Sequence, residues 1–137
     1  MLKQLFLGLF LLGICSAAAH AQDPVKVDSK HYKVEFENSQ VRVLRITYGP
    51  HEKSVMHKHP NAVAIFMTDS NGTFNFPKAP AQPFSSKAGT TMWTAATTHL
   101  PENTGDQPFE VILVELKSKP VKKATTKPAE PKPATKP

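Results

Sequence analysis

The stretch SVMHKHPNAVAIFMTDSNGTFNF, residues 54–76, predicts a fold built from short β-strands. Apolar and β-branched residues recur in it at short spacing, without the stripe that marks an amphipathic helix. We expect strands at 54–59, 62–68 and 73–76. Between the last two, Asp-Ser-Asn-Gly at 69–72 is typical of a tight hairpin, because Asn-Gly supplies the positive φ angles of such a turn. The strands at 62–68 and 73–76 are therefore predicted to be antiparallel neighbours.

The same pattern continues on both sides of this stretch. Pro77, Pro80 and Pro83 predict a loop or a poor edge strand, because proline has no N–H to donate to a sheet. About seven short strands in fewer than 100 residues predict an all-β domain, either a sandwich or a closed barrel. The other strands are expected at 31–37, 41–48, 90–94 and 109–116.

Three histidines are the main candidates for a functional site. His57 and His59 are two residues apart on a predicted strand, so alternation places both imidazoles on one face. His99 follows the strand expected at 90–94, and a barrel would bring it across to the pair. Three neutral imidazoles leave open coordination positions and suit a divalent metal such as Fe, Zn, Mn, Ni or Cu. The alternative is a set of core or surface histidines with ordinary hydrogen bonds.

Over residues 31–117 the sequence resembles the cupin superfamily of small jelly-roll β-barrels. More narrowly, residues 36–43 and 57–60 are similar to a group of short bacterial cupins that includes proteins linked to β-alanine degradation. The resemblance implies a barrel with a metal in its open mouth, and a homodimer paired through edge strands. The residues that match the family's two motifs are Gly49, His57, His59 and Gly72 for the first, and Gly89, His99 and Asn103 for the second.

The sequence also departs from the family's motifs. The positions expected to hold a glutamate ligand carry Val63 and Ala64. The spacer between Gly49 and His57 is longer than usual, and the proline and second glycine of the second motif are absent. A three-histidine site remains, as in some cupin-like thiol dioxygenases that bind iron. The identity of the divalent metal, Fe, Zn, Mn or Ni, stays open.

Other residues are weaker candidates. His51 lies in the turn after Gly49 and is a candidate fourth ligand or proton shuttle, although a solvated loop histidine is the plainer interpretation. Glu52 is a candidate for orienting an imidazole. The residues expected to line the barrel interior are Phe66, Met67, Met92 and Trp93.

The first 21 residues predict a secretory signal peptide. Lys3 precedes an apolar run at 5–14, and small residues at 17–21 suit cleavage after Ala21. Cys15, the only cysteine, falls inside this segment, so the mature protein would have no thiol or disulfide. We expect a periplasmic or secreted protein, with residues 22–30 as an N-terminal extension ahead of the barrel.

The positive charge of the chain, +6 at pH 7, belongs to its C-terminal end. Residues 22–116 hold nine Lys or Arg against ten Asp or Glu, whereas residues 117–137 hold seven Lys against one Glu. Rich in Lys, Pro, Ala and Thr, residues 118–137 predict a disordered basic tail. Such a tail is a spacer or a weak electrostatic contact to anionic envelope surfaces. Nucleic acid is not an expected partner, because basic and aromatic residues are not interleaved.

Two functions are consistent with these features. The first is a metal-dependent enzyme acting on a small molecule, by dioxygenase-, isomerase- or hydrolase-like chemistry. The second is an envelope protein that binds a metal or a small ligand without turning it over. The sequence offers no general base beyond the histidines themselves and no nucleophile with a recognisable partner.

Overall fold

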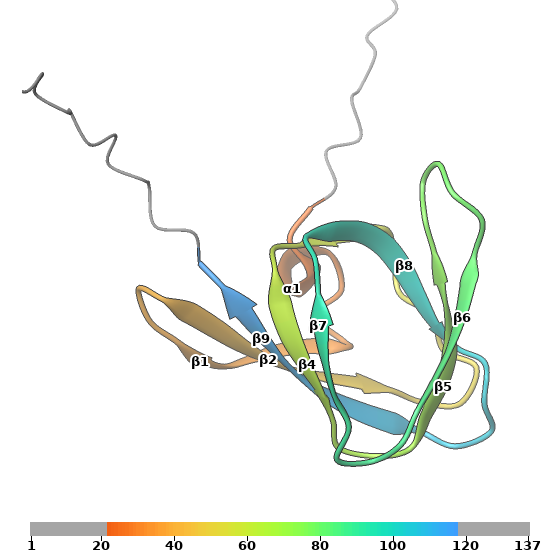
Figure 1. The fold of residues 1–137 in the computed structure, drawn as a ribbon. Helices are drawn as coiled ribbons and strands as arrows, with labels where there is room; N and C mark the ends of the chain where they lie inside the picture. Colours follow the sequence, from red (N-terminus) through yellow and green to blue (C-terminus); the bar gives the residue numbers. More distant parts are fainter. Residues whose placement is uncertain (1–21, 118–137) are drawn as a thin grey trace, which may run out of the picture.

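A computed structural model describes residues 22–117, which form a barrel of β-strands with one short helix (Figure 1). The predicted all-β fold is confirmed. The elements are α1 (Pro24–Val27), β1 (Tyr32–Glu37), β2 (Val41–Tyr48), β3 (His57–His59), β4 (Ala62–Phe66), β5 (Ser70–Asn75), β6 (Gln82–Ser86), β7 (Thr91–Thr94), β8 (Thr97–Asn103) and β9 (Phe109–Leu116).

The strands form two antiparallel sheets. One has five strands in the order β1-β2-β9-β4-β7, and the other has four in the order β3-β8-β5-β6. Figure 1 shows β5 and β6 on the opposite side of the barrel from β1 and β2, with the space between the sheets enclosed. The chain passes repeatedly from one sheet to the other, so residues distant in sequence meet in the interior.

Alternation along the strands of the five-stranded sheet builds the core. Leu44, Ile46 and Tyr48 of β2 are buried, and β9 contributes Phe109, Val111 and Leu113 from the adjacent strand. Because side chains alternate between the two faces of a strand, these residues share the inner face. On the other side of β9, the inner face of β4 carries Ala62, Ala64 and Phe66.

The predicted hairpin at 69–72 is wrong. Asn71 and Gly72 lie inside β5, which pairs with β6 and β8, whereas β4 belongs to the other sheet and pairs with β7 and β9. Gly72 is needed for close packing. A Cβ at this position would lie 2.6 Å from the Phe84 ring and 2.3 Å from the Glu102 carbonyl oxygen. Glycine here marks a close approach within a strand, which the sequence does not distinguish from a turn.

The structure also contains a strand that the sequence did not predict. Strand β8, which carries His99, was not predicted, because the residues Thr-Thr-His-Leu-Pro-Glu-Asn lack a hydrophobic alternation. The proline-rich segment, by contrast, ends in β6, an edge strand that tolerates Pro83 as expected.

The segment 22–30, predicted as an extension, packs against the barrel. Gln22 forms a parallel bridge with His57, and α1 begins after Asp23, whose carboxylate accepts a hydrogen bond from the Val25 N–H at 3.0 Å. Within residues 22–117, no helix is long and apolar enough to cross a membrane. The predicted signal peptide at 1–21 and the basic tail at 118–137 lie outside the described residues.

Candidate metal centre

Strands β3 and β8 bring the three candidate histidines together. His57 is the direct cross-strand partner of His99, and His59 lies on the same face of β3 as His57. One ring nitrogen from each of the three imidazoles lies within 4.8 Å of the others. His57 is fully buried and His59 is almost so, and His99 is half-buried. The fold therefore assembles one compact nitrogen cluster from two adjacent strands.

Hydrogen bonds on the outer nitrogens fix how His57 and His59 face each other. His57 Nδ1 lies 2.7 Å from the Val55 carbonyl oxygen, which can only accept, so this nitrogen carries the proton. His59 Nδ1 lies 2.6 Å from Glu115 Oε1 and donates to that carboxylate. A ring whose proton sits on Nδ1 presents a lone pair at Nε2, and the two Nε2 atoms are 3.0 Å apart. Two facing lone pairs repel unless a cation or a proton lies between them.

His99 completes this electron-rich cluster. Its Nε2 atom is buried and is the one such side-chain atom in residues 22–117 without a hydrogen-bond partner. Burial, reinforced by the neighbouring histidines, lowers the pKa of His57 to about 4 and that of His99 to about 3. Both rings are neutral near pH 7. An orphaned buried nitrogen beside two convergent lone pairs fits a divalent metal with imidazole ligands.

Glu115 bonds to the outer nitrogen of His59 and was not among the residues predicted from the sequence. The carboxylate is buried and lies between His59 and Arg42, whose Nε is 2.6 Å from Glu115 Oε2. Arg42 in turn contacts Asp23 at 2.5 Å. Burial alone would raise the pKa of Glu115, but the hydrogen bonds from His59 and Arg42 outweigh it and lower that pKa. An acidic residue on the same face of β9 as Leu113 was the available signal, because a charge seldom faces a core unpaired.

Strand β4 carries no glutamate at the positions where the family's first motif has one. Ala64 is buried and lines the cavity, and Val63 lies on the opposite face of the strand. Glu115, on the neighbouring strand, holds the outer nitrogen of His59 and does not belong to the nitrogen cluster. The carboxylate of this site therefore orients the His59 ring, an arrangement that is also usual behind histidines that bind metals.

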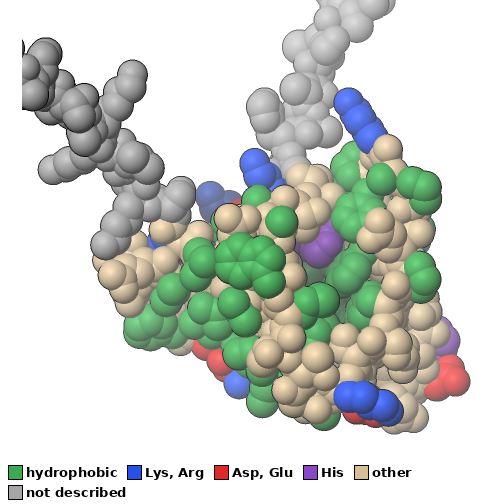
Figure 2. Space-filling view, in the orientation of Figure 1, with side chains coloured by type: hydrophobic (Ala, Val, Ile, Leu, Met, Phe, Trp, Pro, Cys, Tyr) green, Lys and Arg blue, Asp and Glu red, His purple; other side chains and the backbone are tan. Residues whose placement is uncertain are grey.

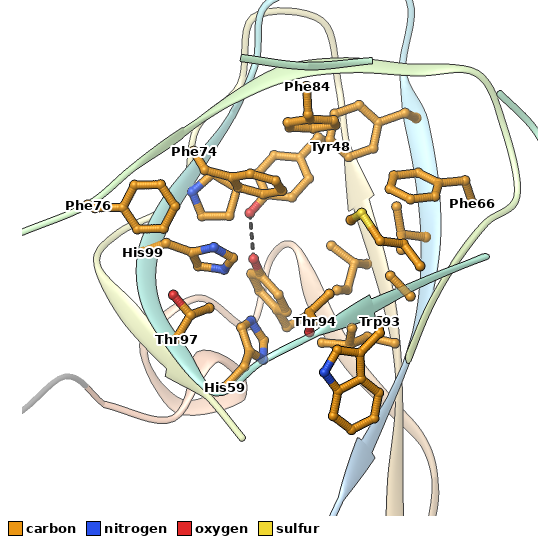
Figure 3. Close-up of a pocket in the computed structure, with 18 residues that line it drawn as sticks. Tyr48, His59, Phe66, Phe74, Phe76, Phe84, Trp93, Thr94, Thr97 and His99 are labelled. Atoms are coloured by element: carbon orange, nitrogen blue, oxygen red, sulfur yellow. Dashed lines mark hydrogen bonds between the residues drawn. The ribbon is translucent and has the colours of Figure 1, made fainter. Parts of the chain in front are cut away.

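A cavity of about 220 Å³ opens beside the histidines. Figure 2 shows a histidine at the bottom of a hollow surrounded by hydrophobic side chains, and Figure 3 shows that His59 and His99 border the same space as the aromatic rings. Among the lining residues in the described part of the chain there is no Asp, Glu, Lys or Arg. The aromatic residues of the lining are Tyr32, Tyr48, Phe66, Phe74, Phe76, Phe84, Trp93 and Phe109.

Three of the four residues predicted to line the interior contribute to this cavity. Phe66 is buried in its wall, and Met92 and Trp93 lie at its margin, 39% and 57% exposed. In Figure 3 the Trp93 ring points away from the other aromatic rings. Met67 does not line the cavity and is largely exposed. It follows Phe66 along the chain, and alternation turns consecutive side chains to opposite faces.

The aromatic wall is held by stacking. Phe74 is nearly parallel to the His99 ring, with centroids 5.0 Å apart, and nearly parallel to Phe84 at 4.4 Å. Deeper in the barrel, the hydroxyls of Tyr32 and Tyr48 form a hydrogen bond of 2.7 Å. Burial raises the pKa of both phenols, so they remain protonated at neutral pH.

The weaker candidates His51 and Glu52 lie elsewhere. His51 has a positive φ of 58°, and its Nε2 lies 2.8 Å from Asp106 in an exposed pair. The structure does not bring it to the three histidines. Glu52 does orient an imidazole, but that imidazole is His31, at 3.1 Å.

Asn103, the asparagine of the second motif, has a structural position. Its side-chain amide donates to the carbonyl oxygens of Gly49 and Gln107, at 2.8 and 2.9 Å. Its Oδ1 accepts from the Gly105 N–H at 2.9 Å. These bonds join the loop after β8 to the loop after β2 and hold the end of the strand that carries His99.

Comparison with known proteins relates this geometry to a fold. No protein-family profile matches the sequence, and no curated protein matches it either. Among solved structures, a cupin domain from Bordetella pertussis is similar with a TM-score of 0.59 and 20% identity, over 64% of this chain and 92% of that one. An RmlC-like cupin with a double-stranded β-helix fold from Methanocaldococcus jannaschii has a TM-score of 0.50 and 17% identity, over 65% and 83%. The likeness at these identities concerns the fold.

Proposed function

Because the chain has the cupin fold, we propose that it binds one divalent metal ion through His57, His59 and His99 and presents it to a small molecule in the barrel. The proposal rests on the Nε2 atoms of His57 and His59, which are 3.0 Å apart, while the Nδ1 atom of each ring faces a hydrogen-bond acceptor. A metal ion would convert this repulsion into coordination. The proposed ligands are neutral imidazoles, which suit iron, zinc, manganese or nickel.

The proposed site would combine an open metal with an apolar chamber. A bound divalent ion supplies Lewis-acid polarisation of a ligand oxygen, and iron would add redox chemistry with oxygen. Val55 and Glu115 hold the tautomers of His57 and His59, so the lone pairs stay directed at one point. The aromatic walls exclude water and would retain the organic part of the ligand. An oxygenase-, isomerase- or hydrolase-like enzyme is consistent with this arrangement.

A binding protein without turnover is the alternative. It is favoured by the lining of the cavity, whose described residues include no carboxylate, lysine or cysteine that could serve as a general base or nucleophile. Turnover with oxygen as co-reactant would support the enzyme, whereas tight retention of an unchanged ligand would support the binding protein.

Both candidate functions require that the three histidines bind a metal ion, and metal titration of variants tests this. The full chain is purified, stripped with a chelator and titrated with zinc or cobalt by calorimetry. We expect one equivalent of metal to bind to the unsubstituted protein. His57→Ala should lose this binding, because only two of the three ligands remain.

His51→Ala is the matched control. It also removes a histidine, but one that is exposed and paired with Asp106. It should bind the same equivalent of metal as the unsubstituted chain. Equal metal binding by His57→Ala and His51→Ala would refute the proposed centre.

We also propose that the chain is exported and cleaved after Ala21. Support comes from the charged, apolar and small-residue layout of residues 1–21. N-terminal sequencing of protein recovered from a periplasmic extract or the medium should begin at Gln22. The basic residues of 118–137 would then contact anionic envelope surfaces, and deleting them should abolish any salt-sensitive association.

A homodimer is proposed from the outer face of the five-stranded sheet. An apolar row crosses all five strands in register, and the residues at its two ends, Phe36 and Trp93, are 53% and 57% exposed. A two-fold axis through the middle of the row would place Phe36 opposite the partner's Trp93, so the row is self-complementary. The row consists of Phe36, Val43, Val114, Val63 and Trp93.

Sedimentation velocity tests this interface. The unsubstituted chain should sediment as a dimer, and Val114→Lys should sediment as a monomer, because the axis would bring two like charges together. Val55→Lys, a control at an exposed valine outside the row, should remain dimeric. A monomeric unsubstituted chain would refute the dimer.

A further inference from the structure

We infer that the cavity takes a planar aromatic molecule with one ring and an anionic oxygen head group, the head directed at the three histidines. This inference rests on the proposed metal centre and specifies its ligand class. Four features of the cavity carry it: the chemistry of its walls, their rigidity, the available volume and the charge of the ligand set.

The walls favour an apolar body. The described lining residues include no Asp, Glu, Lys or Arg, and their hydroxyls are confined to Tyr32, Tyr48, Thr94 and Thr97. The Tyr32 and Tyr48 hydroxyls are already bonded to each other. The polar groups of a highly polar ligand would find few hydrogen-bond partners in this cavity, and the ligand would lose much affinity. Sugars, amino acids and nucleotides are therefore poor matches.

The rigidity of the wall favours a flat ring. Phe74 is sandwiched between His99 and Phe84, and Phe84 meets Phe109 edge to face at 6.1 Å and 79°. Gly72 leaves the space that Phe84 occupies over β5, where a Cβ would clash with the ring. These contacts hold the rings in place before a ligand arrives. A rigid planar ligand loses the least conformational entropy in such a slot and gains edge-to-face contacts with the rings.

The volume limits the body to one ring. About 220 Å³ is available beside the histidines. An apolar cavity of about 150 Å³ accommodates benzene. The remainder is enough for a head group of a few atoms, and a second fused ring would have to extend through the mouth.

The charges around the cluster favour an anionic head. The ligand nitrogens belong to neutral rings, so a divalent ion would keep its full charge in a largely apolar chamber. Glu115 lies behind His59 and is already paired with Arg42. An anionic oxygen from the ligand would offset the buried charge, as a glutamate ligand at position 64, on the cavity face of β4, would otherwise do.

Two hydroxamates test the ligand class. Benzohydroxamate and acetohydroxamate share one metal-binding anionic head and differ in carrying a phenyl ring or a methyl group. Binding to the cobalt-loaded full chain is followed by the visible cobalt absorption bands and by calorimetry. We expect benzohydroxamate to bind about tenfold to a hundredfold more tightly, because its ring would be buried among the phenylalanines. Benzyl alcohol, with the ring but without the anionic head, should leave the cobalt bands unchanged.

Phe84→Leu sharpens the test, because Phe84 contacts Phe74 and Phe109 and makes no stacking contact with His99. It should bind cobalt normally and lose most of the preference for the phenyl ring. Met67→Leu, at an exposed position that does not line the cavity, should keep the preference. Equal affinities for the two hydroxamates, with cobalt bound, would overturn the aromatic ligand and leave the metal centre standing. Failure to bind cobalt would overturn both.

Discussion

His31 and the group of His57, His59 and His99 differ in how completely their ring nitrogens are hydrogen-bonded. His31 is 5% exposed, and both its nitrogens face carboxylates, Asp28 at 2.7 Å and Glu52 at 3.1 Å. Its ring also stacks on Tyr48 at a centroid distance of 4.3 Å. In the second group His57 and His59 are buried and His99 is half-buried, yet the inner nitrogens of the three rings face one another. Burial is common to both groups, so the direction of the unpaired nitrogens distinguishes the candidate site.

This difference has an energetic meaning. A buried polar atom without a partner costs about 1–3 kcal/mol, and folded chains seldom accept that cost without a compensating use. The His31 group avoids the cost by pairing each nitrogen. The three-histidine group accepts it at His99 Nε2, beside the Nε2 atoms of His57 and His59 that face each other at 3.0 Å. His31 is therefore expected to stabilise the fold, and the three-histidine group to bind a ligand.

The largest expected effect is that of His99→Leu on metal affinity. The substitution removes one of three ligands, so zinc affinity should fall by about a hundredfold or more, since each lost ligand weakens the coordination. It also removes the orphaned nitrogen, so the metal-free protein should be no less stable, and more stable by up to about 1 kcal/mol. Calorimetric zinc titration and urea unfolding in chelator measure the two quantities.

The opposite pattern would contradict the comparison. If His99→Leu kept its zinc affinity and unfolded far more easily, His99 would be a structural histidine like His31. Circular dichroism of the metal-free variant checks that the β-fold persists.

Glu115→Gln should have the next largest effect. Glutamine keeps the shape and can still accept the hydrogen bond from His59 Nδ1, but it removes the negative charge that makes the ring a better ligand. We expect zinc affinity to fall by about tenfold to a hundredfold. Asp106→Asn makes the same change beside the exposed His51 and should leave the affinity unaltered. Similar losses of zinc affinity in both variants would mean that the loss comes from the change in net charge and not from the contact between Glu115 and His59.

His31→Leu should produce a smaller effect, on stability alone. It leaves the Asp28 carboxylate, which is largely buried, without its imidazole partner. We expect a loss of about 2 kcal/mol in the free energy of unfolding, with zinc stoichiometry unchanged. Adding Asp28→Asn should restore part of the loss, because the uncompensated charge is then gone. Loss of zinc binding in His31→Leu would remove the distinction between the two groups.

Much of the fold could be predicted from the sequence, because the alternation that builds the core is visible in it. Strands β1, β2, β4 and β9 fall near their predicted places. The alternation is plainest in β2 and β9, whose inner faces carry large apolar residues at every second position. Strand β8 could not be predicted, because its pairing with β3 and β5 depends on the barrel and its residues are mostly polar. Gly72 was misinterpreted for a similar reason, since its need for space arises from a ring twelve residues away in the sequence.

The site was predictable in its ligands and not in its surroundings. His57 and His59 share a face by simple alternation, which the sequence shows directly. The Glu115 support is 56 residues from His59, and the Phe74 and Phe84 wall forms only when β5, β6 and β8 assemble. Only the paired strands reveal which nitrogens are satisfied, and this decides between a structural and a ligating histidine.

A dependence on pH also separates the two groups. In the metal-free protein, burial and the neighbouring imidazoles lower the pKa of His57 to about 4 and that of His99 to about 3, whereas an unfolded chain titrates histidine near about 6.5. As pH falls below about 6.5, the unfolded chain therefore binds protons that the folded chain does not, and stability falls by up to about 1.4 kcal/mol per pH unit for each histidine.

The Asp28 carboxyl, which pairs with His31, should affect stability in a lower pH window. Burial opposes ionisation of Asp28, but hydrogen bonds from Ser54 and His31 outweigh it and lower the pKa of the carboxyl, so its contribution is lost only below about pH 4. Urea unfolding in chelator at pH 7, 6 and 5 should show a decline in the unsubstituted protein and a shallower one in His99→Leu. Equal slopes would mean that His99 is not held neutral by the fold, and the electron-rich cluster on which the metal centre depends would lose its basis.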